Sequence, residues 1–158
     1  MIDNECSESI LADMAALREE ISCDFCAIGF VESPGHSLRW PIASGHTNER
    51  YLNISERSGR GLSATVLKIG RAMPLSMSEL VCSRQLQEYP LLLAENLRSA
   101  YAVPLYKGAE PAGVFIAGDR RKRVYRTEER RLIASSADQV AAVLCRTDSY
   151  GKMGTKVL

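Results

Sequence analysis

The apolar residues of this chain recur at helical spacing in several segments. Between residues 4 and 21 they fall three or four positions apart, so one face of a helix carries Ile10, Met14, Leu17 and Ile21. Similar spacing marks two later helices. The middle one is followed by a closing glycine, and the last one has acidic residues in its first turn. Helices are therefore predicted at residues 4–21, 62–69 and 127–146, with a short one at 91–97.

Short apolar runs between turn residues predict strands. They lie at residues 23–32, 38–44, 72–75, 100–106 and 111–118. Turns after the first and fourth runs join four of them into two hairpins. Pro41 lacks a backbone donor, so the second strand is expected to lie at a sheet edge or to carry a bulge there. Two hairpins predict a central antiparallel sheet flanked by helices, an α+β fold.

The chain length fits one domain. Of the 158 residues, 1–146 are assigned to that domain, and 46% of the chain is hydrophobic, enough for one core. Residues 147–158 hold two glycines and little periodicity, so they are expected to form a flexible C-terminal tail.

Charge and cysteine content narrow the class of protein. The formal net charge is +1, which argues against a nucleic-acid or membrane-surface binder. No apolar run approaches the roughly 20 residues that span a bilayer. The first residues are acidic and lack the pattern of a signal peptide. With five cysteines and no export signal, a cytoplasmic protein with reduced thiols is expected.

A glycine-rich turn precedes the middle helix. Together with Ala64, Gly59 and Gly61 satisfy a dinucleotide-binding fingerprint, but the residues before them are polar rather than a buried strand, so that interpretation is rejected. The N–H groups of the first helical turn are unsatisfied and carry partial positive charge. Leu62, Ser63 and Ala64 are therefore a candidate anion-binding position; water or a side chain at these groups is the commoner alternative.

Taken together, four motifs resemble a GAF domain, the ligand-sensing relative of the PAS fold, over about residues 5–146. They are Gly59-Arg60-Gly61-Leu62-Ser63-Ala64, Gly70-Arg71, Tyr101-Ala102-Val103-Pro104-Leu105 and Gly113-Val114. The resemblance implies a GAF/PAS-like antiparallel sheet flanked by helices.

Three further motifs resemble the stand-alone GAF nitrate receptors of the NreA type. They are Trp40-Pro41-Ile42-Ala43-Ser44-Gly45, Asn48-Glu49-Arg50-Tyr51 and Gly61-Leu62-Ser63. Those proteins bind nitrate and modulate a partner sensor histidine kinase of a two-component system that regulates nitrate respiration. The resemblance implies a cytoplasmic nitrate receptor with no catalytic residue, metal or further cofactor. Because GAF domains often pair through terminal helices, a homodimer is a further expectation.

The same resemblance implies the residues of the nitrate pocket. They are Trp40, Leu62, Ser63, Ala64, Tyr101, Ala102 and Val103. Trp40 would form a wall of the pocket; from the residues alone, core packing is its commoner role. The family has an alanine where this chain has Ser63, whose hydroxyl would either donate to the anion or cap the helix.

Two other functions remain open. One GAF family reduces free methionine-R-sulfoxide with cysteines, and Cys82 lies near the expected region. That cycle needs a second cysteine at the start of the middle helix, where this chain has Gly61-Leu62-Ser63. The other alternative is a GAF interaction module without a ligand.

Two local features add little to this picture. The pair Cys23 and Cys26 lacks the second pair or histidines of a zinc site, and residues three apart in a strand point to opposite faces, so both are expected to be small core residues. Residues 119–131 carry a net charge of +4. This run is either a solvated loop or a docking surface for an acidic protein partner.

Overall fold

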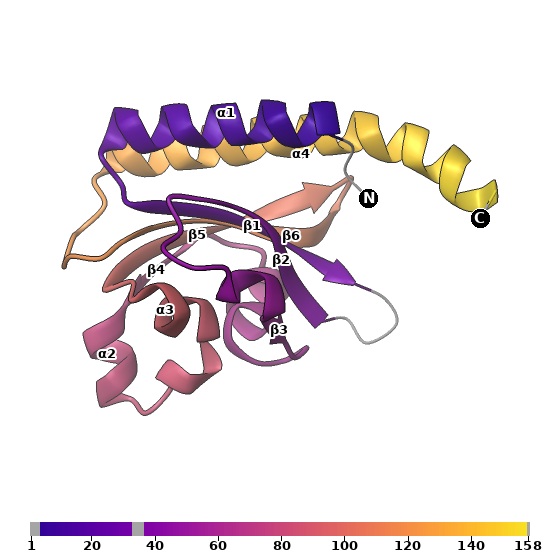
Figure 1. Cartoon of the computed structure of the whole chain (residues 1–158). Helices are drawn as coiled ribbons and strands as arrows, with labels where there is room; N and C mark the ends of the chain where they lie inside the picture. The colour runs from indigo at the N-terminus through magenta and orange to yellow at the C-terminus, as the bar shows by residue number, and fades with distance from the viewer. Residues whose placement is uncertain (1–3, 33–36, 158) are drawn as a thin grey trace.

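Two long helices lie side by side over one face of a six-stranded sheet (Figure 1). The structure is a computed structural model that describes residues 4–32 and 37–157. The two helices are α1 (Asn4–Ile21) and α4 (Thr127–Val157). The bounds of α1 confirm the predicted first helix. Apolar residues at helical spacing give α1 a continuous apolar stripe, and this stripe faces the sheet.

All neighbouring strands of the sheet run antiparallel, in the order β3-β2-β1-β6-β5-β4. The predicted hairpins are confirmed as β1–β2 and β5–β6, and the predicted α+β class is correct. β3 is a two-residue edge strand that the sequence did not predict. The strands are β1 (Phe25–Glu32), β2 (Ser37–Ser44), β3 (Ser55–Glu56), β4 (Met73–Ser76), β5 (Ser99–Lys107) and β6 (Glu110–Asp119).

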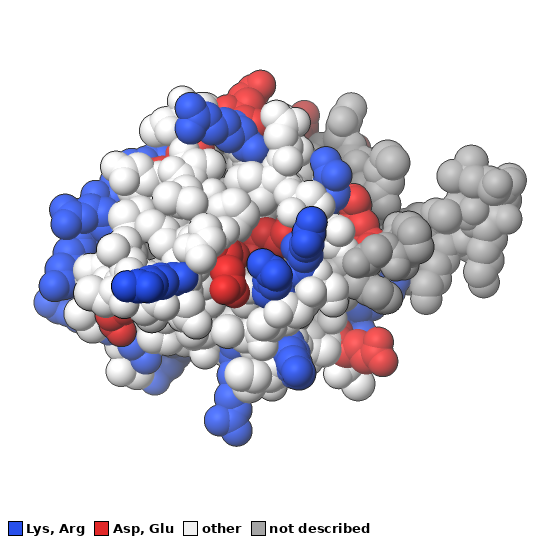
Figure 2. Space-filling view, turned by 90° about the horizontal axis from the view of Figure 1, so that it is seen from below, with Lys and Arg blue, Asp and Glu red and all other residues white. Residues whose placement is uncertain are grey.

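Short helical segments cover the other face of the sheet, below it in Figure 1. They are η1 (Arg50–Asn53), η2 (Ser63–Leu67), α2 (Met77–Cys82), η3 (Leu86–Glu88) and α3 (Pro90–Glu95). The segment η2 is the π-helical middle of a helix over residues 61–69, which confirms the predicted middle helix. Figure 2 views this face, where charged side chains are scattered between larger uncharged areas.

The sheet separates two hydrophobic clusters. The helix-side cluster includes Ile10, Met14 and Leu17 of α1 together with residues of α4. The opposite cluster, here called the site-side cluster, includes Trp40 and Leu62. Because side chains alternate along a strand, each central strand contributes to both clusters. Any site on the site-side face therefore has the sheet between it and the α1–α4 pair.

A β-bulge in β2 orients Trp40. Ile28 of β1 pairs with Ile42, but Phe30 pairs with Arg39, so β2 holds one extra residue in this stretch. The bulge includes Pro41, as the sequence predicted. Trp40 is only 1% exposed, and Gly29 of β1 makes room for its ring, since a Cβ on Gly29 would lie 3.0 Å from the indole.

The last helix is longer than predicted. The expected end at residue 146 is wrong, because α4 continues to Val157. The segment after residue 146 contains no proline, and its glycines lower helix propensity without breaking the hydrogen-bond ladder. The flexibility proposed for residues 147–158 stays a prediction. Across the described residues, no helix is long and apolar enough to cross a membrane.

Candidate functional site

The predicted anion-binding position already faces a carboxylate of the chain itself. β3 pairs with β2 through Leu38 and Glu56, and this register brings the Glu56 side chain under the sheet. Glu56 is 4% exposed, and its Oε2 accepts a hydrogen bond from Nε1 of Trp40 at 2.9 Å. The backbone N–H of Leu62, at the start of the middle helix, also favours the ionised form of this carboxylate. We call Trp40, Glu56, Leu62 and Ser63 the helix-start site.

Burial changes the ionisation of Glu56. Desolvation raises the pKa of Glu56 to about 7, although the hydrogen bonds from Trp40 and Leu62 favour the ionised form and lower it. The carboxyl group therefore changes charge near neutral pH. Burial also raises the pKa of the neighbouring Tyr89, so the phenol is neutral in the same range. Glu56 is the one group of the helix-start site that titrates near pH 7.

Two polar atoms of this site have no hydrogen-bond partner among the described residues. They are Oε1 of Glu56 and Oγ of Ser63, and both are buried. A buried polar atom without a partner costs on the order of 1–3 kcal/mol, so such atoms usually mark an ordered water or a ligand. Both atoms belong to the helix-start site. This is the feature of the structure that points to a bound polar molecule.

The other donors of the first turn have partners within the chain. The N–H groups of Ser63 and Ala64 donate to the carbonyl of Arg60, at 3.0 and 3.4 Å. Gly61 has a φ of +53°, and a Cβ there would lie 2.1 Å from the carbonyl oxygen of Glu88, so only glycine fits. A ligand at the helix start would therefore meet the partial positive charge of the helix N-terminus and the Ser63 hydroxyl, rather than a row of free N–H groups.

The sheet divides the set of residues predicted from the resemblance. Trp40, Leu62 and Ala102 lie together in the site-side cluster. Tyr101 and Val103 belong to the helix-side cluster, so their side chains do not face Trp40. This follows from strand alternation along β5.

Gly29 sets the space available to Trp40. Replacing Gly29 with alanine is expected to lower the free energy of unfolding by roughly 1–2 kcal/mol, because the new methyl group presses on a buried indole that has little room to move. Urea unfolding followed by circular dichroism measures this loss. In a Trp40→Phe background the smaller ring should reduce the loss and leave the part that comes from Leu38, whose side chain would lie 3.1 Å from the same Cβ; an equal loss in both backgrounds would contradict the contact with the indole.

The two cysteines of the C-x-x-C motif are core residues, as predicted, but they lie on the same face of the sheet. Both side chains lie in the helix-side cluster, and their Sγ atoms are 3.8 Å apart. The prediction of opposite faces is wrong because β1 begins at Phe25, so Cys23 precedes the strand and does not follow its alternation. In the part of the chain that the structure describes, no group of three His, Cys, Asp or Glu residues suits a metal ion.

The reductase alternative finds little support in the placement of the cysteines. Cys82 is exposed on α2, while Cys6, Cys23 and Cys26 are buried in the helix-side cluster. The sheet therefore separates Cys82 from these three thiols. The side chain of Cys145 lies outside the described residues. Cys82 thus has no described cysteine with which to complete a disulfide cycle.

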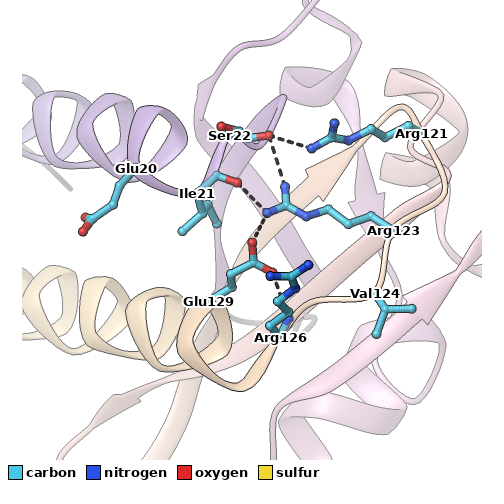
Figure 3. A pocket seen from close by; sticks show the side chains of 8 residues that line it. All are labelled: Glu20, Ile21, Ser22, Arg121, Arg123, Val124, Arg126 and Glu129. Atoms are coloured by element: carbon cyan, nitrogen blue, oxygen red, sulfur yellow. Dashed lines mark hydrogen bonds and ion pairs between the residues drawn. The ribbon is translucent and has the colours of Figure 1, made fainter.

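Part of the basic run has a structural role. Figure 3 shows a surface pocket of about 410 Å³ between the end of α1 and the start of α4. Arg123 donates to the carbonyl of Ser22 at 3.1 Å and pairs with the buried Asp119 at 3.0 Å. Arg120 pairs with the buried Glu95. Among the remaining basic residues, Arg121, Lys122, Arg126 and Arg131 are exposed, so a docking role stays a prediction.

Known proteins share this architecture and part of this sequence. An NreA protein from Staphylococcus aureus, mutated in its nitrate binding site, is 30% identical; the match covers 78% of this chain and 95% of that one, with a TM-score of 0.66. A hypothetical protein from S. aureus is 35% identical; the match covers 73% of this chain and 95% of that one, with a TM-score of 0.61. No curated protein matches the chain.

A third structure shows the fold alone. The GAF domain of a phosphoenolpyruvate-protein phosphotransferase from Coxiella burnetii is 16% identical, with a TM-score of 0.78 over 93% of this chain and 86% of that one. A family model described as the GAF domain matches residues 7–144, which include the whole sheet, α1 from residue 7 on and the helix-start site. The chain therefore belongs to the GAF domain family.

Proposed function

We propose that this protein is a GAF receptor that binds nitrate at the helix-start site and carries out no catalysis. The observation that carries the proposal is the pair of buried, unpartnered polar atoms on Glu56, which is bonded to the Trp40 indole, and on Ser63 at the helix start. The similarity to an NreA protein described by its nitrate binding site supports the choice of anion. We include in the proposed site Ala64, the residue after Ser63, and Ala102, whose side chain lies in the site-side cluster; the side chains of Tyr101 and Val103 lie on the other face of the sheet.

The chemistry of the site favours a weakly hydrated monovalent anion. Nitrate is planar, and an indole ring offers it an apolar wall without a large desolvation cost. The Ser63 hydroxyl supplies one donor, and a protonated Glu56 carboxyl supplies another. Sulfate and phosphate need more charge compensation than these neutral donors provide, so the site should exclude them.

Nitrate and an ionised Glu56 do not fit together in this site. Two like charges in a poorly solvated space repel each other strongly, so nitrate binding requires the neutral carboxyl group. The pKa of about 7 means that this form is present near neutral pH. Nitrate binding therefore takes up a proton wherever Glu56 is ionised beforehand.

The fold supplies a route from the site to a partner. Ala102 of β5 faces the site, while the adjacent Tyr101 and Val103 face the α1–α4 pair, where Arg130 of α4 lies over the Tyr101 ring at 5.2 Å. Nitrate shifts an equilibrium only if it binds one arrangement of these elements more tightly. We assign the α1–α4 face to a sensor histidine kinase or to a second copy of the chain, with regulation of a two-component system as the output.

A calorimetric titration with sodium nitrate at pH 6 tests the proposal. We expect saturable heat with one site per chain, and none with chloride, sulfate or phosphate at equal ionic strength. Circular dichroism confirms that the protein is folded under the same conditions. Absence of nitrate heat from folded protein would overturn the receptor function.

One observation favours a second candidate, a GAF interaction module without a small ligand. The Glu56 carboxylate itself lies at the helix start, where it accepts a hydrogen bond from the Trp40 indole and is favoured by the Leu62 N–H, as a bound anion would be. Glu56→Gln separates the two functions. Nitrate binding to the wild type at pH 6 and to this variant supports the receptor, whereas no binding to either supports the interaction module.

A further inference from the structure

The link between α1 and β1 holds two thiols in contact. Sγ of Cys23 and Sγ of Cys26 lie 3.8 Å apart and share a hydrogen bond. Cys23 is 5% exposed and Cys26 is fully buried. Ser22, with a φ of +55°, turns the chain at the end of α1 and brings Cys23 back over the start of β1. The helix-start site on the other face of the sheet uses neither thiol.

The surroundings distinguish the two thiols. A hydrogen bond from Cys26 lowers the pKa of Cys23, with a further contribution from Arg123 and Arg18, against desolvation and Asp119. The same hydrogen bond and complete burial raise the pKa of Cys26 well above its ordinary value. The thiolate is the reactive form of a cysteine. Cys23 is therefore the nucleophile of the pair, and Cys26 keeps its proton.

A surface pocket lies beside the link that carries Cys23. The pocket in Figure 3 is lined by Ile21 and Ser22, the two residues before Cys23, and by Arg123. The side chain of Arg123 binds the carbonyl groups of both Ile21 and Ser22 and so fixes this stretch of the link. A small neutral oxidant in this pocket contacts Ile21 and Ser22, the residues directly before Cys23, and reaches the buried thiol when this link moves.

We propose that Cys23 and Cys26 are a redox-active pair that hydrogen peroxide converts into an intramolecular disulfide. The Cys23 thiolate attacks one peroxide oxygen, the O–O bond breaks, and hydroxide leaves, which gives a sulfenic acid on Cys23. Sγ of Cys26 then attacks the Cys23 sulfur. The S–S bond forms, the S–O bond breaks, and the Cys26 proton departs with the hydroxyl group as water. The two thiols lose two electrons, which reduce the peroxide.

The required movement is small. A disulfide needs its sulfur atoms about 2.05 Å apart, so the thiols approach by roughly 1.8 Å. Cys23 lies outside the ladder of β1, and its N–H donates to the carbonyl of Arg18 in α1, so the sulfur atoms approach mainly by side-chain rotation. The resulting bond closes the link between α1 and the sheet and fixes how the end of α1 lies on it. The proposal does not depend on nitrate binding.

Peptide mass spectrometry of the wild-type protein tests this assignment. Trypsin releases residues 19–39 as one peptide that contains Cys23 and Cys26 and no other cysteine. The reduced, folded protein is treated with hydrogen peroxide, blocked with iodoacetamide in denaturant and digested. We expect the mass of this peptide to fall by two hydrogen atoms and neither of its cysteines to be alkylated. The disulfide should form at least about tenfold faster than the exposed Cys82 is oxidised. Full alkylation of both thiols while Cys82 is oxidised would overturn the proposal.

Two variants test the roles within the pair. In Cys26→Ser, the sulfenic acid on Cys23 should persist and be trapped by dimedone; in Cys23→Ser, Cys26 should give no adduct. Equal labelling of the two variants would overturn the assignment of Cys23 as nucleophile. If either variant fails to fold, the peptide from the oxidised wild-type protein is sufficient to test the proposal. A sulfinic acid in this peptide, without a disulfide, also contradicts the proposal.

Discussion

Glu56→Gln is expected to stabilise the protein at pH 8 and to lose most of that gain by pH 5. Folding raises the pKa of this carboxyl group from an ordinary value of 4.5 to about 7, chiefly through desolvation. Between these two values the folded state holds a proton that the unfolded state has released. Stability therefore falls as the pH rises from about 4.5 through 7, and the whole penalty is present above that range.

The size of this penalty follows from the shift. At about 1.4 kcal/mol for each pKa unit, the ionised, buried Glu56 costs about 3 kcal/mol at pH 8. Glutamine has nearly the same shape and still accepts the Trp40 indole N–H, so the variant should keep the packing and avoid the charge. For a domain of this length the gain corresponds to a rise in Tm of roughly 6–12 °C.

Thermal unfolding of the wild type and the variant between pH 5 and pH 8 measures the effect. Their Tm values should diverge as the pH rises. Glu110→Gln is the matched control, because Glu110 is exposed near the β5–β6 turn and its charge costs little. If the Glu56→Gln and wild-type profiles ran parallel, the carboxyl group would not be buried as described.

The sequence predicts most of the fold because hydrophobic periodicity reports local structure. The first helix and both hairpins come directly from it, and Pro41 indicates the bulge in β2. What it misses depends on contacts across the chain. The two-residue β3 exists only because Glu56 pairs with Leu38 of β2, and no local pattern marks such a short strand.

The candidate site is only partly predictable for the same reason. Trp40 and Leu62 come together as expected, because their motifs mark a strand and a helix start that pack in one cluster. Glu56 lies inside a polar segment whose pattern predicts no site; the available signal is a carboxylate five residues before Gly61. The strand period predicts that Tyr101 and Val103 share a face, but not which face carries the site.

Nitrate affinity should fall about tenfold for each pH unit above 7 in the wild type. Binding requires the neutral form of Glu56, and the fraction of that form drops tenfold per unit above its pKa of about 7. Between pH 6 and pH 9 the dissociation constant should therefore rise roughly 100-fold. In Glu56→Gln the side chain stays neutral and keeps an N–H donor, so the affinity should hardly change over the same range.

Proton counting separates this explanation from a general effect of pH. Titrations at pH 9 in two buffers with different ionisation enthalpies should show the uptake of nearly one proton per nitrate in the wild type, and of none in Glu56→Gln. At pH 6 both proteins should take up almost none, because Glu56 is already protonated. Nitrate binding without proton uptake at pH 9 would mean that the anion binds away from Glu56. Proton uptake by the wild type alone would identify Glu56 as the group that couples nitrate occupancy to pH.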